Sequence, residues 1–76
     1  MSIKFISFSE AQHLYTRGVC VWFYDARGQL LDGIQAYTLG KWAKARNRRR
    51  NARTFAHHFK FCMENWGPGI QMGISQ

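Results

Sequence analysis

Residues 19–28, VCVWFYDARG, form the stretch that decides the fold. Residues 19–24 are β-branched, aromatic or otherwise apolar on both faces, which predicts a central or well-covered strand. Asp25 suits the first position of a type I turn, and Gly28 can supply the positive φ at the end of such a turn. The stretch therefore predicts a β-hairpin whose second strand runs over residues 29–31.

Beyond the hairpin, the sequence supports two alternatives at Asp32. The pair Asp32-Gly33 favours a second tight turn, followed by a third strand over residues 34–37. Asp32 is also a suitable helix N-cap, and a helix would then begin here instead. The tight turn is the preferred interpretation.

Before the hairpin, the sequence predicts a strand over residues 3–8 and then a short helix. Ser9 is a good N-cap, Glu10 complements the positive end of the helix, and Gly18 is a good stop signal. An apolar stripe with helical spacing supports this helix, at Ala11, Leu14 and Tyr15.

Residues 39–66 predict a long helix with two apolar stripes that do not line up. The first stripe comprises Leu39, Trp42 and Ala43, and the second Ala52, Phe55, Ala56, Phe59, Cys62, Met63 and Trp66. At 100° per residue, Trp42 lies about 140° around the axis from Phe55. The helix therefore either bends near residues 47–51, or stays straight with its first half projecting past the core. Both solutions expose Arg48, Arg49 and Arg50.

The glycine-proline-glycine sequence at residues 67–69 ends this helix and leaves a tail that is expected to pack loosely or fray. Together these elements predict a single α+β domain over residues 1–76. We expect an N-terminal antiparallel hairpin or meander with a short helix, followed by a long or bent C-terminal helix that is basic and amphipathic. The tail covers residues 67–76.

The charge is concentrated in one segment, residues 41–53, which we call the basic segment. It holds seven basic residues and no acid, whereas four bases and four acids balance in the rest of the chain. The net charge of +7 therefore lies entirely in the basic segment. Clustered like charges repel one another, so such a block favours binding to a polyanion.

The basic segment predicts binding to DNA or RNA. Arginine suits phosphate oxygens and base edges, and asparagines spaced i, i+4 could read adenine. Trp42 either stacks on a base or anchors the helix to the sheet. The candidate nucleic-acid-binding residues are Lys41, Trp42, Lys44, Arg46, Asn47, Arg48, Arg49, Arg50, Asn51 and Arg53. Residues 44–53, KARNRRRNAR, are similar in composition to arginine-rich helices of some small RNA-binding proteins and indicate no particular family.

The alternative is an accessory or inhibitor protein. Small, basic, aromatic-rich chains without catalytic residues are typical of accessory proteins from viruses and mobile elements. Such a protein would dock its arginines on an acidic surface of a host protein or nucleoprotein complex.

The sequence favours neither catalysis nor a bound cofactor. It contains no carboxylate pair, Ser-His-Asp order or glycine-rich phosphate loop. His58 and Cys62 are spaced i, i+4, but neither His13 nor Cys20 completes a paired zinc motif, so no metal site is predicted and both cysteines are expected to be reduced. No signal peptide or membrane span is evident, so we expect a cytoplasmic protein.

Overall fold

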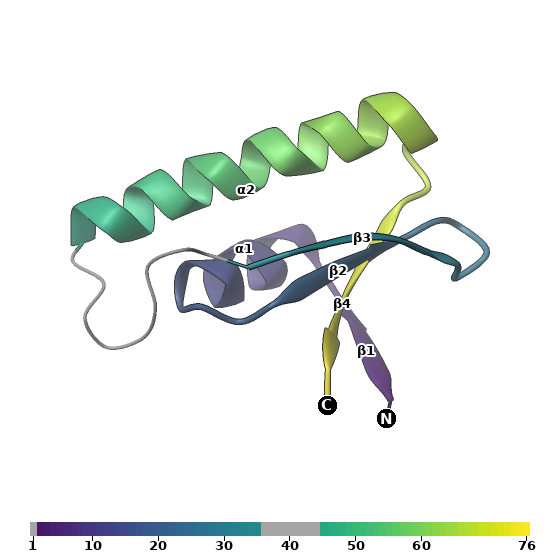
Figure 1. Cartoon of the computed structure of the whole chain (residues 1–76), viewed down its shortest axis with the longest axis horizontal. Coiled ribbons are helices and arrows are strands. Elements are labelled where there is room, and N and C mark those ends of the chain that lie inside the picture. The colour runs from purple at the N-terminus through teal and green to yellow at the C-terminus, as the bar shows by residue number, and fades with distance from the viewer. Residues whose placement is uncertain (1, 36–44) are drawn as a thin grey trace.

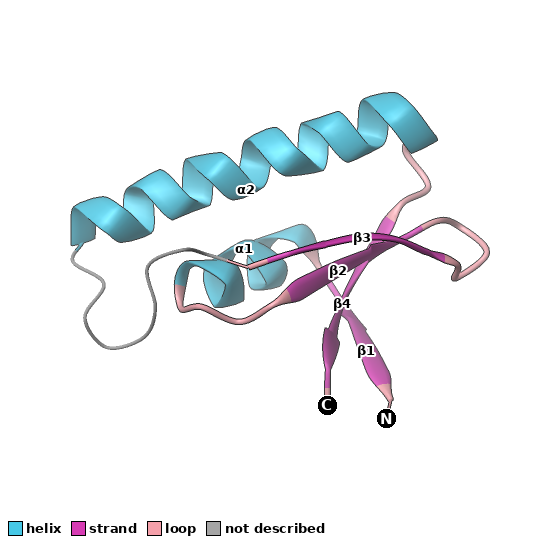
Figure 2. Ribbon diagram, in the orientation of Figure 1, coloured by secondary structure: helices cyan, strands magenta, loops and turns pink. Residues whose placement is uncertain are grey.

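The computed structural model describes residues 2–35 and 45–76. Along the chain, a strand and a short helix are followed by a hairpin, a long helix and a last strand (Figures 1 and 2). The elements are β1 (Ile3–Ile6), α1 (Phe8–Thr16), β2 (Val21–Tyr24), β3 (Leu30–Ile34), α2 (Ala45–Trp66) and β4 (Gln71–Ser75). The predicted α+β fold is confirmed.

The four strands form one antiparallel sheet in the order β1-β4-β2-β3. The last strand of the chain, β4, is therefore an interior strand. Met72 lies opposite Ile6 on one side and Phe23 on the other, so the two ends of the chain lie side by side (Figure 1). The prediction of a loose tail is wrong, because both edges of β4 are paired and Ile70 and Met72 are buried.

The core lies between the sheet and the two helices, and Phe55 of α2 is at its centre. The Phe55 ring is fully buried, with centroids 5.5 Å from Phe8, 5.3 Å from Tyr15 and 5.8 Å from Phe23. These contacts join α2 to α1 and to β2. Most of the predicted apolar stripe of α2 faces this core, but Trp66, in the last turn, is 44% exposed.

The hairpin forms where the sequence predicts it. The Gly28 N–H donates to the Asp25 carbonyl over 3.0 Å, and Gly28 has a φ of 85°. The Asp25 carboxylate stabilises the turn by accepting from the N–H groups of Arg27 and Gln29. As predicted, β2 is an interior strand: Val21 and Phe23 are fully buried on the helix side, and Trp22 and Tyr24 are half-buried on the other.

Two boundaries differ from the sequence prediction. The first strand ends at Ile6, and Ser7 rather than Ser9 caps α1, with its Oγ accepting from the Glu10 N–H over 3.2 Å. This is the Ser-x-x-Glu spacing of a capping box, which is a stronger start signal than a lone serine at position 9.

The predicted turn at Asp32-Gly33 is also wrong, as is the alternative helix cap. Both residues lie within β3, with Asp32 opposite Phe23 and Gly33 opposite Trp22. Gly33 is required by close packing, because a Cβ there would lie 2.3 Å from Cε3 of Trp22. The sequence predicts a third strand over residues 34–37, but Ile34 is the last residue of β3. Residues 36–37 lie outside the described residues.

Within the described residues, α2 is continuous through residues 47–51. The predicted bend or break is therefore not found in this part of the helix. α1 packs beside α2 here, and Gln12 Nε2 donates to the Ala52 carbonyl over 2.9 Å. The first stripe, at Leu39, Trp42 and Ala43, lies outside the described residues.

Replacing Phe55 with alanine is expected to lower the free energy of unfolding by about 3–5 kcal/mol, because it leaves a cavity at the centre of the core. Phe61 on the same helix is 52% exposed and provides the control. Phe61→Ala should cost less than about 1 kcal/mol. Urea denaturation of the two variants and the parent measures both values, and equal losses would contradict the central position of Phe55.

Deleting residues 70–76 is expected to abolish folding, because both β1 and β2 then lose their pairing partner. The deletion also removes the buried side chains of Ile70 and Met72. Amide proton dispersion in an NMR spectrum is the measurement, and a truncated chain with native dispersion would show that β4 is dispensable.

Candidate nucleic-acid interface

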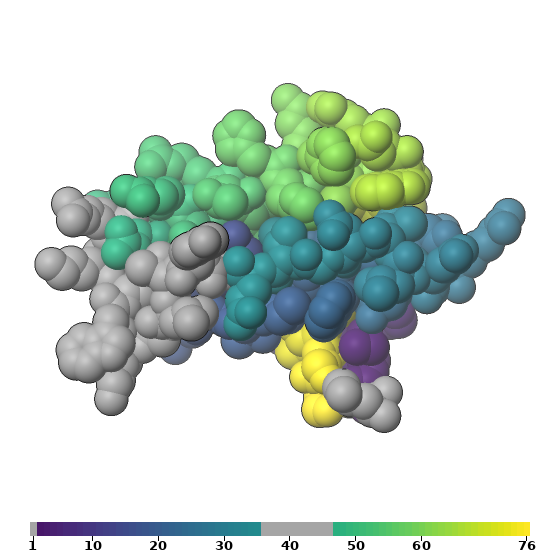
Figure 3. Space-filling model, in the orientation of Figure 1, coloured from purple at the N-terminus to yellow at the C-terminus, as the bar shows by residue number. Residues whose placement is uncertain are grey.

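Four arginines of the basic segment are exposed on the first half of α2, namely Arg48, Arg49, Arg50 and Arg53, which we call the arginine cluster. Arg49 and Arg53 are spaced i, i+4 and share one side of the helix. Since Asn51 and Phe55 point into the core, this side faces outward. In Figure 3, α2 lies along the outer surface of the molecule.

The arginine cluster is in an unfavourable place for the helix itself. The positive end of the helix dipole lies at its N-terminus, where acids stabilise and bases destabilise. The first turn of α2 carries no acid and includes Arg48, and beyond this turn the like charges of Arg49 and Arg53 repel each other at the i, i+4 spacing. A local conflict of this kind is typical of residues retained for function rather than for stability.

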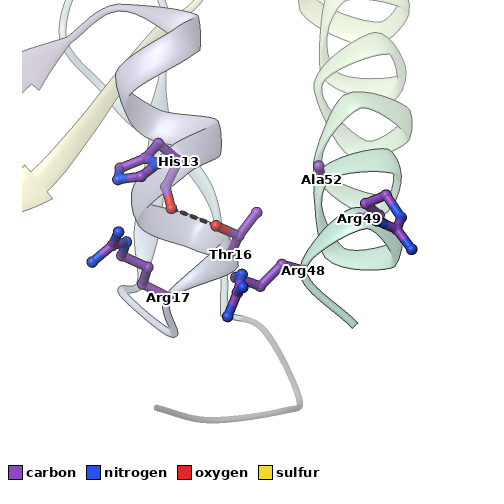
Figure 4. A pocket seen from close by; sticks show the side chains of 6 residues that line it. All are labelled: His13, Thr16, Arg17, Arg48, Arg49 and Ala52. Carbon is purple, nitrogen blue, oxygen red and sulfur yellow. Dashed lines mark hydrogen bonds between the residues drawn. The ribbon is translucent and has the colours of Figure 1, made fainter. Parts of the chain in front are cut away.

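The fold brings Arg17 close to the arginine cluster. Arg17 is not among the residues that the sequence predicts to bind nucleic acid. A cleft of about 350 Å³ lies between the last turn of α1 and the first half of α2, lined by His13, Thr16, Arg17, Arg48, Arg49 and Ala52. Figure 4 shows Arg48 extending from α2 toward Thr16, whereas Arg17 and Arg49 point to the outer sides of their helices. Arg48 therefore brings a guanidinium group into the cleft, whereas Arg17 lines the opposite wall with its guanidinium group directed outward.

The two asparagines of the segment lie in different environments. Asn51 is only 6% exposed, and its Nδ2 has no hydrogen-bond partner. Asn47 is half-buried. Burial argues against the expected reading of adenine by Asn51, because the amide is shielded from solvent.

The side chains of four candidate residues lie outside the described part of the structure. Lys41, Trp42 and Lys44 lie outside the described residues. Arg46 belongs to α2, but its side chain is not among those described. The described part of the interface therefore consists of the arginine cluster, Asn47 and the cleft.

A second group of polar side chains lies at the other half of α2. His58 and Cys62, which the sequence places on one helix face, are joined by Asp32 of β3, with Asp32 Oδ2 3.1 Å from His58 Nε2. The sequence analysis missed Asp32 because it placed that residue in a turn. Burial raises the pKa of the Cys62 thiol, and the Asp32 carboxylate raises it further. A thiol of this kind stays protonated at neutral pH and is a poor nucleophile.

Asn51→Leu tests the role of the buried amide. Because Nδ2 is unpartnered, we expect leucine to raise the free energy of unfolding by up to about 1 kcal/mol, or to leave it unchanged. Nucleic-acid affinity, measured by fluorescence anisotropy on the folded variant, should not change. A loss of about 1–3 kcal/mol in binding would instead identify Asn51 as a base-reading residue.

Among the described residues, no helix combines the length and the apolar character needed to cross a membrane. Comparisons with protein-family models, with curated proteins and with solved structures found no match.

Proposed function

We propose that this protein is a small, non-enzymatic nucleic-acid-binding protein that uses the arginine cluster to contact the phosphate backbone of DNA or RNA. The observation that carries the proposal is the exposure of Arg48, Arg49, Arg50 and Arg53 on one half of a helix that is packed against the sheet and α1. A packed helix presents these charges at low entropic cost. Arg17, on the opposite wall of the cleft, extends the positive surface.

The geometry favours phosphate contacts over base reading. Arg48, Arg49 and Arg50 are consecutive in a helix, so their side chains leave the axis about 100° apart. Three such directions do not reach one row of base edges, but they suit the two backbones that border a groove. Contacts of this kind provide affinity and position, with little sequence specificity.

The second candidate is an accessory or inhibitor protein that docks on an acidic surface of a host protein or nucleoprotein complex. It is favoured by the outer face of the sheet, where Phe5 is 48% exposed and packs edge-on against the half-buried Tyr24. Exposed aromatic side chains are typical of protein interfaces. A pull-down with and without nuclease treatment separates the two candidates, since a protein partner is retained after nuclease.

Binding to duplex DNA should weaken steeply with salt. If about four to six phosphates are contacted, log K falls with log salt at a slope of about −4 to −5. Replacing Arg48, Arg49 and Arg50 together with glutamine should flatten this slope by up to about three units. Fluorescence anisotropy titrations at several salt concentrations measure the slope, and circular dichroism checks that the variant is folded.

The matched control removes the same charge elsewhere. Lys4, Arg27 and Lys60 are exposed and lie outside the basic segment, so their replacement with glutamine lowers the net charge equally. The control should keep more of the parent affinity than the arginine variant does. Equal losses would attribute binding to net charge alone. If the folded arginine variant keeps the parent's affinity and slope, the nucleic-acid proposal fails and the accessory-protein alternative takes its place.

A further inference from the structure

Three side chains with metal-ligating atoms converge between β3 and the second half of α2. Asp32 pairs with Phe23, whose side chain faces the helices, so the carboxylate also lies on the helix side of the sheet. His58 and Cys62 are spaced i, i+4 and lie on the face of α2 that meets this part of β3. One ligand atom from each residue lies within 4.8 Å of the other two. We call these residues the Asp32–His58–Cys62 cluster.

The ligand atoms are held in place by their surroundings. Asp32 Oδ1 accepts a hydrogen bond from the Gly33 N–H over 2.8 Å. The imidazole ring lies near Phe23 and Phe61, with centroids 5.2 and 6.0 Å away. Cys62 is fully buried. Such outer contacts orient metal ligands and raise the affinity of a site.

The imidazole nitrogen provides an independent observation. His58 Nε2 is buried and makes no hydrogen bond, although Asp32 Oδ2 is within hydrogen-bonding distance. Asp32 Oδ2 lies close enough for an ion pair with a protonated imidazole, but the two atoms do not form a regular hydrogen bond. A buried polar atom without a partner is uncommon in a folded protein, and an ion is one of the explanations. An ion bound beside Nε2 would satisfy it.

We propose that the Asp32–His58–Cys62 cluster binds a divalent transition-metal ion, with zinc as the preferred ion. Zinc accepts mixed sulfur, nitrogen and oxygen ligands, whereas magnesium and calcium prefer oxygen alone. The ion binds Cys62 as the thiolate, so binding releases the thiol proton to solvent. Zinc–ligand bonds of about 2.0–2.3 Å in a tetrahedral site place the ligand atoms about 3.3–3.6 Å apart. The observed spacing reaches this geometry with small side-chain movements.

The fourth position of the ion is open to solvent. Among the described residues, no other histidine, cysteine or acid joins the cluster, and the Asp32 side chain is 41% exposed. Water therefore completes the coordination. The bound ion would link the edge strand β3 to α2. This site is separate from the arginine cluster, so the metal proposal does not depend on the proposed nucleic-acid function.

Cobalt(II) tests the site directly, because it reports both geometry and thiolate ligation. The parent protein, purified without metal under reducing conditions, should take up about one equivalent of cobalt per chain. It should show the intense visible bands of tetrahedral cobalt and a near-ultraviolet thiolate-to-cobalt charge-transfer band. Zinc should displace the cobalt and abolish both, and zinc should raise the temperature of unfolding.

Substitutions assign the ligands. Asp32→Asn and His58→Gln should weaken zinc binding by more than about 100-fold, which exceeds the usual effect of losing a second-shell contact. Cys62→Ser should remove the charge-transfer band. The matched controls are Cys20→Ser, the other cysteine, and His57→Gln, the exposed neighbour of His58, and both should bind zinc as the parent does. The variant that lacks Arg48, Arg49 and Arg50 should also bind normally.

Three results would overturn the proposal. The first is no uptake of cobalt or zinc by the folded parent protein. The second is a charge-transfer band that persists in Cys62→Ser or disappears in Cys20→Ser. The third is an unchanged zinc affinity in folded Asp32→Asn. Because Asp32 is partly exposed, this last variant decides the question even if the substitution at the buried Cys62 prevents folding.

Discussion

The packing of Phe55 against Phe8, Tyr15 and Phe23 determines how the rest of the molecule is arranged. These contacts hold α2 across the sheet and also define its rotation about its own axis. A helix with Phe55 inward must turn the side that carries Arg49 and Arg53 outward. The same rotation directs His58 and Cys62 toward β3. One buried ring therefore orients both surfaces of functional interest.

The two halves of α2 have different chemical character. The first half carries the arginine cluster and lies beside α1, which contributes Arg17 and supports the helix through Gln12. The second half lies over β3 and carries two of the three residues of the Asp32–His58–Cys62 cluster. Because the described helix is continuous between them, an ion that ties β3 to α2 would also stiffen the element that presents the arginines.

The small size of the domain explains why so much depends on its last residues. A chain of 76 residues buries a smaller fraction of its unfolded surface than a larger domain does. Each strand therefore contributes a large share of the core. Because β4 lies between β1 and β2, the pairing of the two chain ends connects β1 to the rest of the sheet. Within residues 2–35 and 45–76, this arrangement leaves the arginine cluster exposed on the outer side of α2.

Local features of the sequence determined the hairpin, the stop at Gly18, the main apolar face of α2 and the concentration of charge. Each of these depends on residues that are close along the chain. β4 was missed because five residues, QMGIS, carry too weak a pattern, and its pairing with β1 joins segments about 70 positions apart. A short strand of this kind is recognised only through its neighbours in the sheet.

The tertiary structure alone decided which polar side chains meet. It buried Asn51, placed Arg17 beside the arginine cluster and brought Asp32 to His58 and Cys62. The sequence presented His58 and Cys62 as a pair on one helix face, but it could not supply the third residue. Whether Asp32 lies in a turn or in a strand depends on pairing with β2, and strand pairing is a property of the folded sheet rather than of the local sequence.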